Sequence, residues 1–368
     1  MKGVLIVDSI AIDAMGGDFG PEEVVAAIQL ATREYGPLPP ITLVGQQNHL
    51  EEAASKYGLQ LGSAVTTRHA SEVITMDEKP IQSIKQKKDA SLVRAIECVK
   101  NGEAAAAISL GNTGSLMACS TLKLRTAQGI ERPALGVIMP TRDHHIVLCD
   151  VGSNPEAKPN HLVHNAVLAS EYCRIVLHKE APRIGLLSIG TEENKGTETV
   201  TEAHKQLKSL GNTLNYQGPI EGFQIFENHV DVVVCNGFVG NILLKSSESL
   251  FGILKDYLKA ELSRNIFRKA GALLSQQAFR DMKSQLNPDY HSGAPMLGLR
   301  GLVVKTHGSS DRKAIAGALR VTTELLNHNL NECIQERISI VNKLLNQQNN
   351  PSTPQGCEQD ISQTSHRN

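Results

Sequence analysis

Residues 104–122 read AAAAISLGNTGSLMACSTL, an uncharged stretch that is almost long enough to span a bilayer. Gly111-Asn112-Thr113-Gly114 interrupts this stretch with polar residues that are typical of turns. We therefore predict a buried strand over residues 105–110, then a loop, and a helix that begins near Gly114. A strand that leads through a glycine-rich turn into a helix is the βα unit of parallel sheets.

The same βα pattern recurs at least six times along the chain. The other strands are predicted at residues 10–13, 41–45, 146–151, 184–189, 230–235 and 302–306, mostly as continuous apolar runs that suit strands covered on both faces. The other helices are predicted to begin near residues 21, 91, 159, 197, 240 and 311. This alternation indicates a three-layer α/β/α fold, Rossmann-like, with a mostly parallel sheet.

Composition limits the class of protein. The chain has 368 residues, of which 40% are hydrophobic, so it can bury a large core. We expect one catalytic domain over residues 1–344 and a disordered tail over residues 345–368, where polar residues and proline replace apolar ones. A net charge of −1 gives no general attraction to nucleic acid.

The cysteines and the N-terminus indicate the compartment. Seven cysteines form an odd set without a Cys-x-x-Cys pair, which is typical of buried thiols in a reducing environment. The apolar run before Asp8 is too short for a signal peptide, so a cytoplasmic location is expected.

Five loops that directly follow predicted strands are rich in Gly, Asn, Asp and Ser. Glycine lets the backbone approach an anion closely, and the amides at a helix start then point at it. We expect these loops to converge on a phosphate site, with Lys195 placed against the bound anion. The five loops are residues 13–21, 111–115, 150–154, 190–196 and 236–241.

Other kinds of site have little support in the sequence. Lys195 precedes Gly196, which reverses the order of a P-loop, and no Gly-x-Gly-x-x-Gly follows the first strand. Neither His144-His145 nor the pair of His161 and His164 has the ligand spacing of a zinc site. The chain has no Gly-x-Ser-x-Gly motif. We therefore expect chemistry without a metal, a cofactor or a covalent enzyme intermediate.

Taken together, these loops resemble the PlsX family of phosphate acyltransferases, which is similar in fold to phosphotransacetylases and isocitrate dehydrogenases. The resemblance spans about residues 10–326 and rests on the number and order of the motifs. The motifs are DAMGGDFGP at residues 13–21, GNTG at 111–114, GIERPA at 129–134, IGTEENKG at 189–196, GFVGN at 237–241, GAPMLG at 293–298 and HGSS at 307–310.

This resemblance implies a reaction, its partners and its site. Inorganic phosphate attacks the thioester of acyl carrier protein and releases acyl phosphate for a membrane glycerol-phosphate acyltransferase. Lys195 is expected to hold the phosphate or stabilise the oxyanion, and Asn241 to orient the thioester carbonyl. The phosphate and the substrate are expected to contact Asp13, Gly16, Gly17, Asp18, Gly111, Asn112, Thr113, Gly114, Asn154, Gly190, Gly196, Gly237, Gly240, His307 and Ser309.

Three residues depart from the pattern of the family. Asn236 stands where relatives usually carry Asp, and Ser115 and Ser153 stand where Ala is common. Asn236 cannot act as a base, so the sequence argues against a mechanism that needs a carboxylate at this position. Because phosphate is already anionic at neutral pH, it needs little deprotonation.

A basic amphipathic segment covers residues 251–286. Basic residues surround apolar ones such as Phe267, Leu273 and Leu274. Such a segment could lie on an anionic bilayer as a peripheral membrane contact, pack in a homodimer, or bind the acidic carrier protein. An ordinary solvated face is the fourth interpretation, and the sequence leaves all four open.

Competing functions also stay open. A phosphotransacetylase that uses acyl coenzyme A would share the fold, and the donor that it accepts would distinguish it. A catalytically silent scaffold between fatty acid synthesis and the membrane is another possibility, which the presence of Lys195 and Asn241 disfavours. A dehydrogenase is disfavoured by the missing dinucleotide motif.

Overall fold

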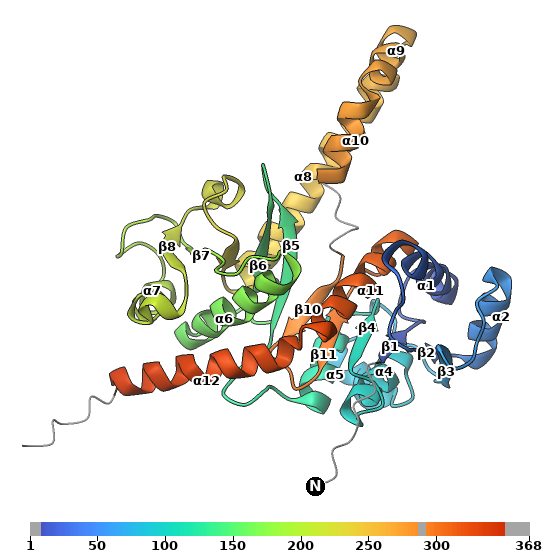
Figure 1. The fold of residues 1–368 in the computed structure, drawn as a ribbon, viewed down its shortest axis with the longest axis horizontal. Coiled ribbons are helices and arrows are strands. Elements are labelled where there is room, and N and C mark those ends of the chain that lie inside the picture. The colour runs from blue at the N-terminus through green and yellow to red at the C-terminus, as the bar shows by residue number, and fades with distance from the viewer. Residues whose placement is uncertain (1–8, 286–291, 350–368) are drawn as a thin grey trace, which may run out of the picture.

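The computed structural model describes residues 9–285 and 292–349. Within these residues, eleven strands form one sheet in the order β3-β2-β1-β4-β11-β10-β5-β6-β9-β7-β8 (Figure 1). The strands are β1 (Ile10–Asp13), β2 (Ile41–Gly45), β3 (Val65–His69), β4 (Ala106–Ser109), β5 (Ala134–Pro140), β6 (His145–Cys149), β7 (Ile184–Leu187), β8 (Tyr216–Ile220), β9 (Val232–Val234), β10 (Ala294–Leu297) and β11 (Leu302–Lys305).

Helices cover both faces of this sheet. They are α1 (Gly20–Tyr35), α2 (Gln47–Tyr57), α3 (Pro80–Gln86), α4 (Ser91–Lys100), α5 (Thr113–Leu124), α6 (Pro159–Val176), α7 (Glu198–Ser209), α8 (Gly237–Ser263), α9 (Ile266–Leu274), α10 (Gln276–Gln285), α11 (Arg312–Asn327) and α12 (Leu330–Asn349). One outer layer contains α1, α11, α6, α12 and α7, while α3, α4 and α5 lie on the other face of the first half of the sheet. The predicted α/β/α architecture is confirmed.

The sheet consists of two parallel halves joined by antiparallel strands. The first half is β3-β2-β1-β4-β11 and the second half is β6-β9-β7-β8. Strands β10 and β5 lie between them, and the pairs β11–β10, β10–β5 and β5–β6 are all antiparallel. The two halves therefore run in opposite directions along the sheet.

Apolar strands and amphipathic helices build the core. All four residues of β1, β4 and β11 are buried, as expected for central strands that have helices on both faces. Helix α6 is buried along almost its whole length, because the sheet lies on one side of it and α7, α11 and α12 lie on the other. Tyr172 in α6 is among the largest side chains with no exposed surface.

Helices α8, α9 and α10 project away from this core (Figure 1). Only Gly237 and Gly240 in the first turn of α8 are buried, so the projection begins well before Phe251, where the amphipathic segment was predicted to start. The end of that predicted segment at residue 286 lies outside the described residues.

The last helix, α12, continues to Asn349, whereas the tail was predicted to begin at residue 345. The rest of that predicted tail lies outside the described residues. Helix α12 runs from the centre of the sheet along its second half and packs on α6 (Figure 1).

Candidate active site

Loops that follow β1, β4 and β11 form a first cluster. We call this set, residues 14–20, 110–112 and 306–311, the first loop cluster. Because these three strands are parallel neighbours, their carboxyl ends lie side by side. The amide of Asp18 donates to the carbonyl of Gly308 at 2.9 Å, which joins two of the loops.

Close backbone packing fixes the first loop cluster. A Cβ atom on Gly16 would lie 2.5 Å from Oδ2 of Asp13 and 2.7 Å from the amide nitrogen of Gly111, so only glycine fits there. Asn112 caps α5 by accepting from the amide of Ser115 at 2.9 Å, and its Nδ2 donates to the carbonyl of Met76 at 2.7 Å. The loops are therefore held by the protein itself.

The predicted first-half residues are gathered in this cluster and at the adjoining starts of α1 and α5. Asp13 is fully buried, so its carboxylate lies beneath the loops and is not exposed to solvent. His307 Nδ1 and the hydroxyl of Ser309 are hydrogen-bonded at 2.8 Å. Thr113 and Gly114 form the first turn of α5.

A second cluster is formed by the loops after β6, β9 and β7. We call this set, residues 150–158, 235–236 and 188–197, the second loop cluster. Asp150 organises its centre, because the carboxylate accepts from the amides of Leu135 and Ser153, both at 3.0 Å, and from the amide of Asn154 at 2.7 Å. The amide of Gly237 then donates to the carbonyl of Asn154 at 2.9 Å.

Helix α8 starts directly against this loop. A Cβ atom on Gly240 would lie 2.0 Å from the carbonyl oxygen of Asp150. Because this oxygen belongs to the backbone, no rotation of a side chain could relieve the clash. The next residue, Asn241, faces Gly152, where an added Cβ atom would lie 3.8 Å from Oδ1 of Asn241. The close approach of α8 therefore fixes where Asn241 sits.

Lys195 and Asn241 are both exposed at the second loop cluster. Lys195 lies in the loop after β7, the strand next to β9, and its backbone carbonyl accepts from the hydroxyl of Ser188 at 3.2 Å. Within residues 9–285 and 292–349, neither the side-chain ammonium of Lys195 nor the side-chain amide of Asn241 has a hydrogen bond or an ion pair. Gly190 and Gly196 belong to the same loop as Lys195.

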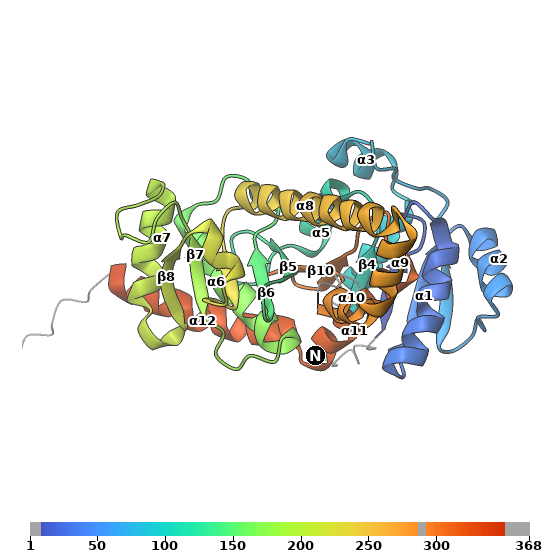
Figure 2. The ribbon, with the colours of Figure 1, turned by 90° about the horizontal axis from the view of Figure 1, so that it is seen from above.

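The predicted loops are therefore gathered into two clusters, because the sheet reverses direction between its halves. Helix α8 begins at the second cluster and runs toward the side of the first half (Figure 2) while it projects away from the sheet (Figure 1). Lys245, about 12 Å along the helix axis from Gly237, interacts electrostatically with Lys305 and His307 of the first half.

Burial shifts the pKa values of ionisable side chains at both clusters. Burial raises the pKa of Asp13 and of Asp150, and hydrogen bonds from Ser109 and from backbone amides, respectively, oppose this rise. Burial lowers the pKa of Lys305 to about 8, and Asp13 opposes this fall. His307 also has a lowered pKa, first because of burial and then because of the charge of Lys245.

Sequence reasoning missed Lys305, Lys245 and Asp150 as site residues. Lys305 ends an apolar strand two residues before His307, and a charge at that place was the available signal. Asp150 lies in a loop that was singled out, but its role as an acceptor for three amides depends on tertiary contacts.

The structure describes the three residues that depart from the family pattern, Asn236, Ser115 and Ser153. Asn236 is the N-cap of α8 and accepts from the amide of Val239 at 2.8 Å, a role that Asp fills equally well. The hydroxyl of Ser115 is hydrogen-bonded to that of Ser83 at 3.2 Å, which links α5 to α3. Ser153 Oγ is buried and has no hydrogen bond to the described residues.

The histidines considered as metal ligands bind other side chains. His161 pairs with Glu131 at 3.0 Å, and His164 Nε2 is 3.0 Å from the amide oxygen of Asn342. Among the residues that the structure describes, no three His, Cys, Asp or Glu side chains are grouped as metal ligands would be.

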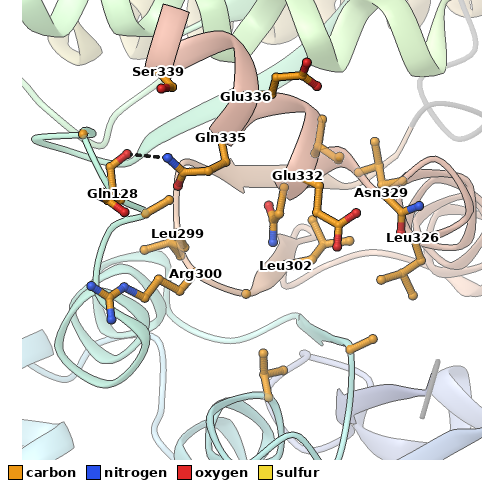
Figure 3. A pocket seen from close by; sticks show the side chains of 18 of the residues that line it. Gln128, Leu299, Arg300, Leu302, Leu326, Asn329, Glu332, Gln335, Glu336 and Ser339 are labelled. Carbon is orange, nitrogen blue, oxygen red and sulfur yellow. Dashed lines mark hydrogen bonds between the residues drawn. The ribbon is translucent and has the colours of Figure 1, made fainter. Parts of the chain in front are cut away.

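A large cavity lies away from both clusters. It has a volume of about 1690 Å³ and is lined by α12, the end of α11 and the amino ends of β4 and β11 (Figure 3). Gln335 Nε2 donates to the carbonyl of Gln128 across one side at 2.8 Å. Ligands of open α/β sheets bind at the carboxyl ends of strands, so we place the active site at the loop clusters.

Comparison of the sequence with known families identifies one match. The model of the family described as "Fatty acid synthesis protein" matches residues 9–333. The phosphate acyltransferase of Syntrophotalea carbinolica is 39% identical over 333 residues, which cover 90% of this chain and 94% of that protein. The phosphate acyltransferase of Nitratidesulfovibrio vulgaris is 42% identical over 329 residues, which cover 89% and 94%.

Comparison with solved structures gives the same fold. The phosphotransacetylase of Streptococcus pyogenes superimposes with a TM-score of 0.59 at 19% identity, over 87% of this chain and 94% of that one. A branched-chain phosphotransacylase from Enterococcus faecalis gives a TM-score of 0.54 at 16% identity, over 86% and 98%. The predicted likeness to phosphotransacetylases is confirmed at the level of the fold.

Proposed function

Because this chain belongs to the fatty acid synthesis protein family, whose relatives include phosphate acyltransferases, we propose that it transfers a long-chain fatty acyl group from acyl carrier protein to inorganic phosphate. Acyltransferase activity follows from the family. The carrier protein as donor, the roles of individual residues and the link to the membrane are the proposal. The product, an acyl phosphate, would be the substrate of a membrane glycerol-phosphate acyltransferase in phospholipid synthesis.

One observation carries the assignment of the site. Lys195 and Asn241 are exposed side chains that have no partner among the described residues, and Asn241 stands beside the loop that the carboxylate of Asp150 holds through three backbone amides. A polar side chain that makes no hydrogen bond or ion pair within the protein is available to bind a substrate. We therefore assign the phosphate and the thioester carbonyl to these two side chains.

The reaction needs no enzyme nucleophile. A phosphate oxygen forms a bond to the thioester carbon, the carbon–sulfur bond breaks, and the thiolate takes up the proton that the phosphate loses. Lys195 would stabilise the charge that develops on the carbonyl oxygen, and Asn241 would orient the thioester. Five cysteines are buried, and burial raises the pKa of Cys119 to about 12, which disfavours them as nucleophiles.

The first test is phosphate-dependent release of free carrier thiol from long-chain acyl carrier protein. We expect acyl phosphate to form with the wild-type protein and the rate to fall roughly 10²-fold or more in Lys195→Ala, the usual effect of removing a preorganised electrostatic donor. Lys205→Ala is a matched control, because Lys205 is an exposed lysine of the following helix α7. Near-normal turnover of a folded Lys195→Ala protein would exclude the role of Lys195.

Acyl coenzyme A serves as the second donor in the same assay. A clear preference for acyl coenzyme A would favour a phosphotransacetylase, and no turnover with either donor would favour a scaffold. Asn236→Asp completes this series. Because both residues cap α8 equally well, we expect a rate within a few-fold of the wild type, and a large gain would show that a carboxylate is needed at this position.

The projecting helices α8–α10 supply the contact with a membrane in this proposal. Residues 237–285 contain eight Lys and Arg against four Asp and Glu, in a chain whose net charge is −1. Ile266, Phe267, Leu273 and Leu274 are 71–89% exposed, and within the described residues no helix could span a bilayer. A basic segment with exposed apolar side chains suits an anionic membrane surface.

Two variants test this contact. Phe267→Glu places a charge on the exposed apolar surface and is expected to abolish binding to anionic liposomes, whereas Phe223→Glu changes an exposed phenylalanine on the β8–β9 connection. A homodimer through the same helices would instead show a fall in molar mass for Phe267→Glu in light scattering. Binding of the carrier protein would show as a higher KM for acyl carrier protein with unchanged liposome binding.

A further inference from the structure

Three buried polar side chains occupy one level of the first parallel half of the sheet. Asp13, Ser109 and Lys305 are the last residues of β1, β4 and β11, and the strand register pairs Ser109 with both of the others. Their exposed fractions are 0%, 1% and 8%. The hydroxyl of Ser109 donates to Asp13 Oδ2 at 2.6 Å. Because burial of polar groups costs free energy, a row of them at the end of apolar strands indicates a specific role.

The ammonium of Lys305 joins two loops of the first loop cluster. It donates to the carbonyl of Leu110 at 3.4 Å and to the carbonyl of Thr306. Leu110 begins the loop after β4, and Thr306 begins the loop after β11. In the same layer, the amide of Gly111 donates to the hydroxyl of Ser109 at 3.1 Å. The lysine therefore connects two loops that are far apart in the sequence.

Charged groups from four places surround this ammonium. Asp13 comes from β1, Asp18 from the loop after it, Lys245 from α8 and His307 from the loop after β11. Asp13 and Asp18 favour the ammonium, while Lys245 and burial favour the neutral amine. The balance lowers the pKa of Lys305 to about 8. The neutral amine that forms above this pH keeps two N–H groups, so both protonation states can donate to the two carbonyls.

We propose that Lys305 is a positioning residue for acyl transfer: its side-chain nitrogen holds the loops after β4 and β11 together by donating to one carbonyl of each loop. The inference rests on the proposed function, since the first loop cluster is taken as part of the phosphate acyltransferase site. Lys305 acts through the loop backbone, because its side chain is almost completely buried.

The first test compares kcat and KM for phosphate at pH 7. Lys305→Met removes both donated hydrogen bonds and should lower kcat/KM roughly 10²-fold, the effect of a small misplacement at an active site. Lys305→Arg keeps N–H donors at this position and should retain most of the activity. A folded Lys305→Met protein with kcat/KM within about threefold of the wild type would overturn the proposal.

The second test does not depend on activity. Amide hydrogen exchange at a fixed pH should be faster in Lys305→Met for residues 110–112 and 306–310, and unchanged in the rest of the described chain. Lys305→Arg should retain most of the protection of these loops, which keeps the test valid if the methionine variant folds poorly. Lys56→Met, which removes an exposed lysine paired with Glu22 at 2.6 Å, is the control.

The two tests separate the two hypotheses. If the wild-type protein transfers no acyl group to phosphate, the proposed function fails, while faster exchange of the two loops in Lys305→Met still supports the positioning role. If the enzyme is active but the loops of Lys305→Met exchange at the wild-type rate, the positioning role is refuted and the proposed function stands.

Discussion

Substitution of Gly240 by alanine tests whether the close approach of α8 to the second loop cluster sets the position of Asn241. The added Cβ atom would lie 2.0 Å from the carbonyl oxygen of Asp150 and 2.9 Å from Sγ of Cys235. Ordinary contact begins at 3.4 Å, so the helix and the loop must separate by about 1.4 Å. The main obstacle is a backbone atom, and no rotamer change can remove it.

The size of the effect follows from this displacement. A shift of about 1 Å at a catalytic group commonly costs roughly 10²-fold in rate, so we expect kcat to fall by about that factor. Overpacking costs about 1–3 kcal/mol of unfolding free energy, from which the better helix propensity of alanine recovers about 1 kcal/mol. Activity should therefore suffer much more than stability.

The assay compares kcat and urea unfolding for Gly240→Ala and Gly252→Ala. Gly252 lies in the same helix, and a Cβ atom added there meets nothing within 4 Å. Gly252→Ala should keep the wild-type kcat and gain up to about 1 kcal/mol of unfolding free energy. Gly240→Ala with kcat within about threefold of the wild type would refute the argument that this contact positions Asn241.

Three further predictions concern stability and pH. The hydroxyl of Tyr172 is buried without a hydrogen bond to the described residues, so Tyr172→Phe should leave the unfolding free energy unchanged or raise it by about 1 kcal/mol in urea titrations. Asp311 caps α11 through the amides of Lys313 and Ala314, so Asp311→Ala should cost about 1 kcal/mol, while Asp311→Asn should retain most of it. Between about pH 8 and pH 10.5, unfolded chains bind a proton at Lys305 that the folded protein lacks, so unfolding free energy should rise with pH by up to roughly 3 kcal/mol. Lys305→Met should lack this rise, which urea titrations at pH 7 and pH 10 would measure.

The strands of the two parallel halves, apart from the edge strands β3 and β8, were the most predictable part of the fold. Strands β1 and β2 begin and end where the apolar runs at residues 10–13 and 41–45 begin and end. Strands β3, β5, β8 and β10 were missed, because their sequences carry weaker signals. Strand β3 (VTTRH) lies at an edge of the sheet and is mostly polar, and β5, β8 and β10 each contain proline.

The antiparallel centre of the sheet could not be predicted from local pattern. A run of apolar residues shows that a strand is buried, but it carries no information on the direction of its neighbour. The loops were therefore expected to meet at one site, whereas β10 and β5 divide them into two clusters. The candidate site residues were chosen because glycine, asparagine and aspartate have recognisable roles in loops after strands.

The place of β11 in the sheet has a consequence for synthesis of the protein. Strand β11 pairs with β4, yet residues 110–301 separate the two strands in the sequence. On the ribosome, the backbone N–H and C=O groups on this edge of β4 stay unpaired until β11 has been translated and has left the exit tunnel. Unpaired strand edges recruit other chains, and long-range pairing is slow. The nascent chain therefore carries this unpaired strand edge until nearly the whole sequence has been made.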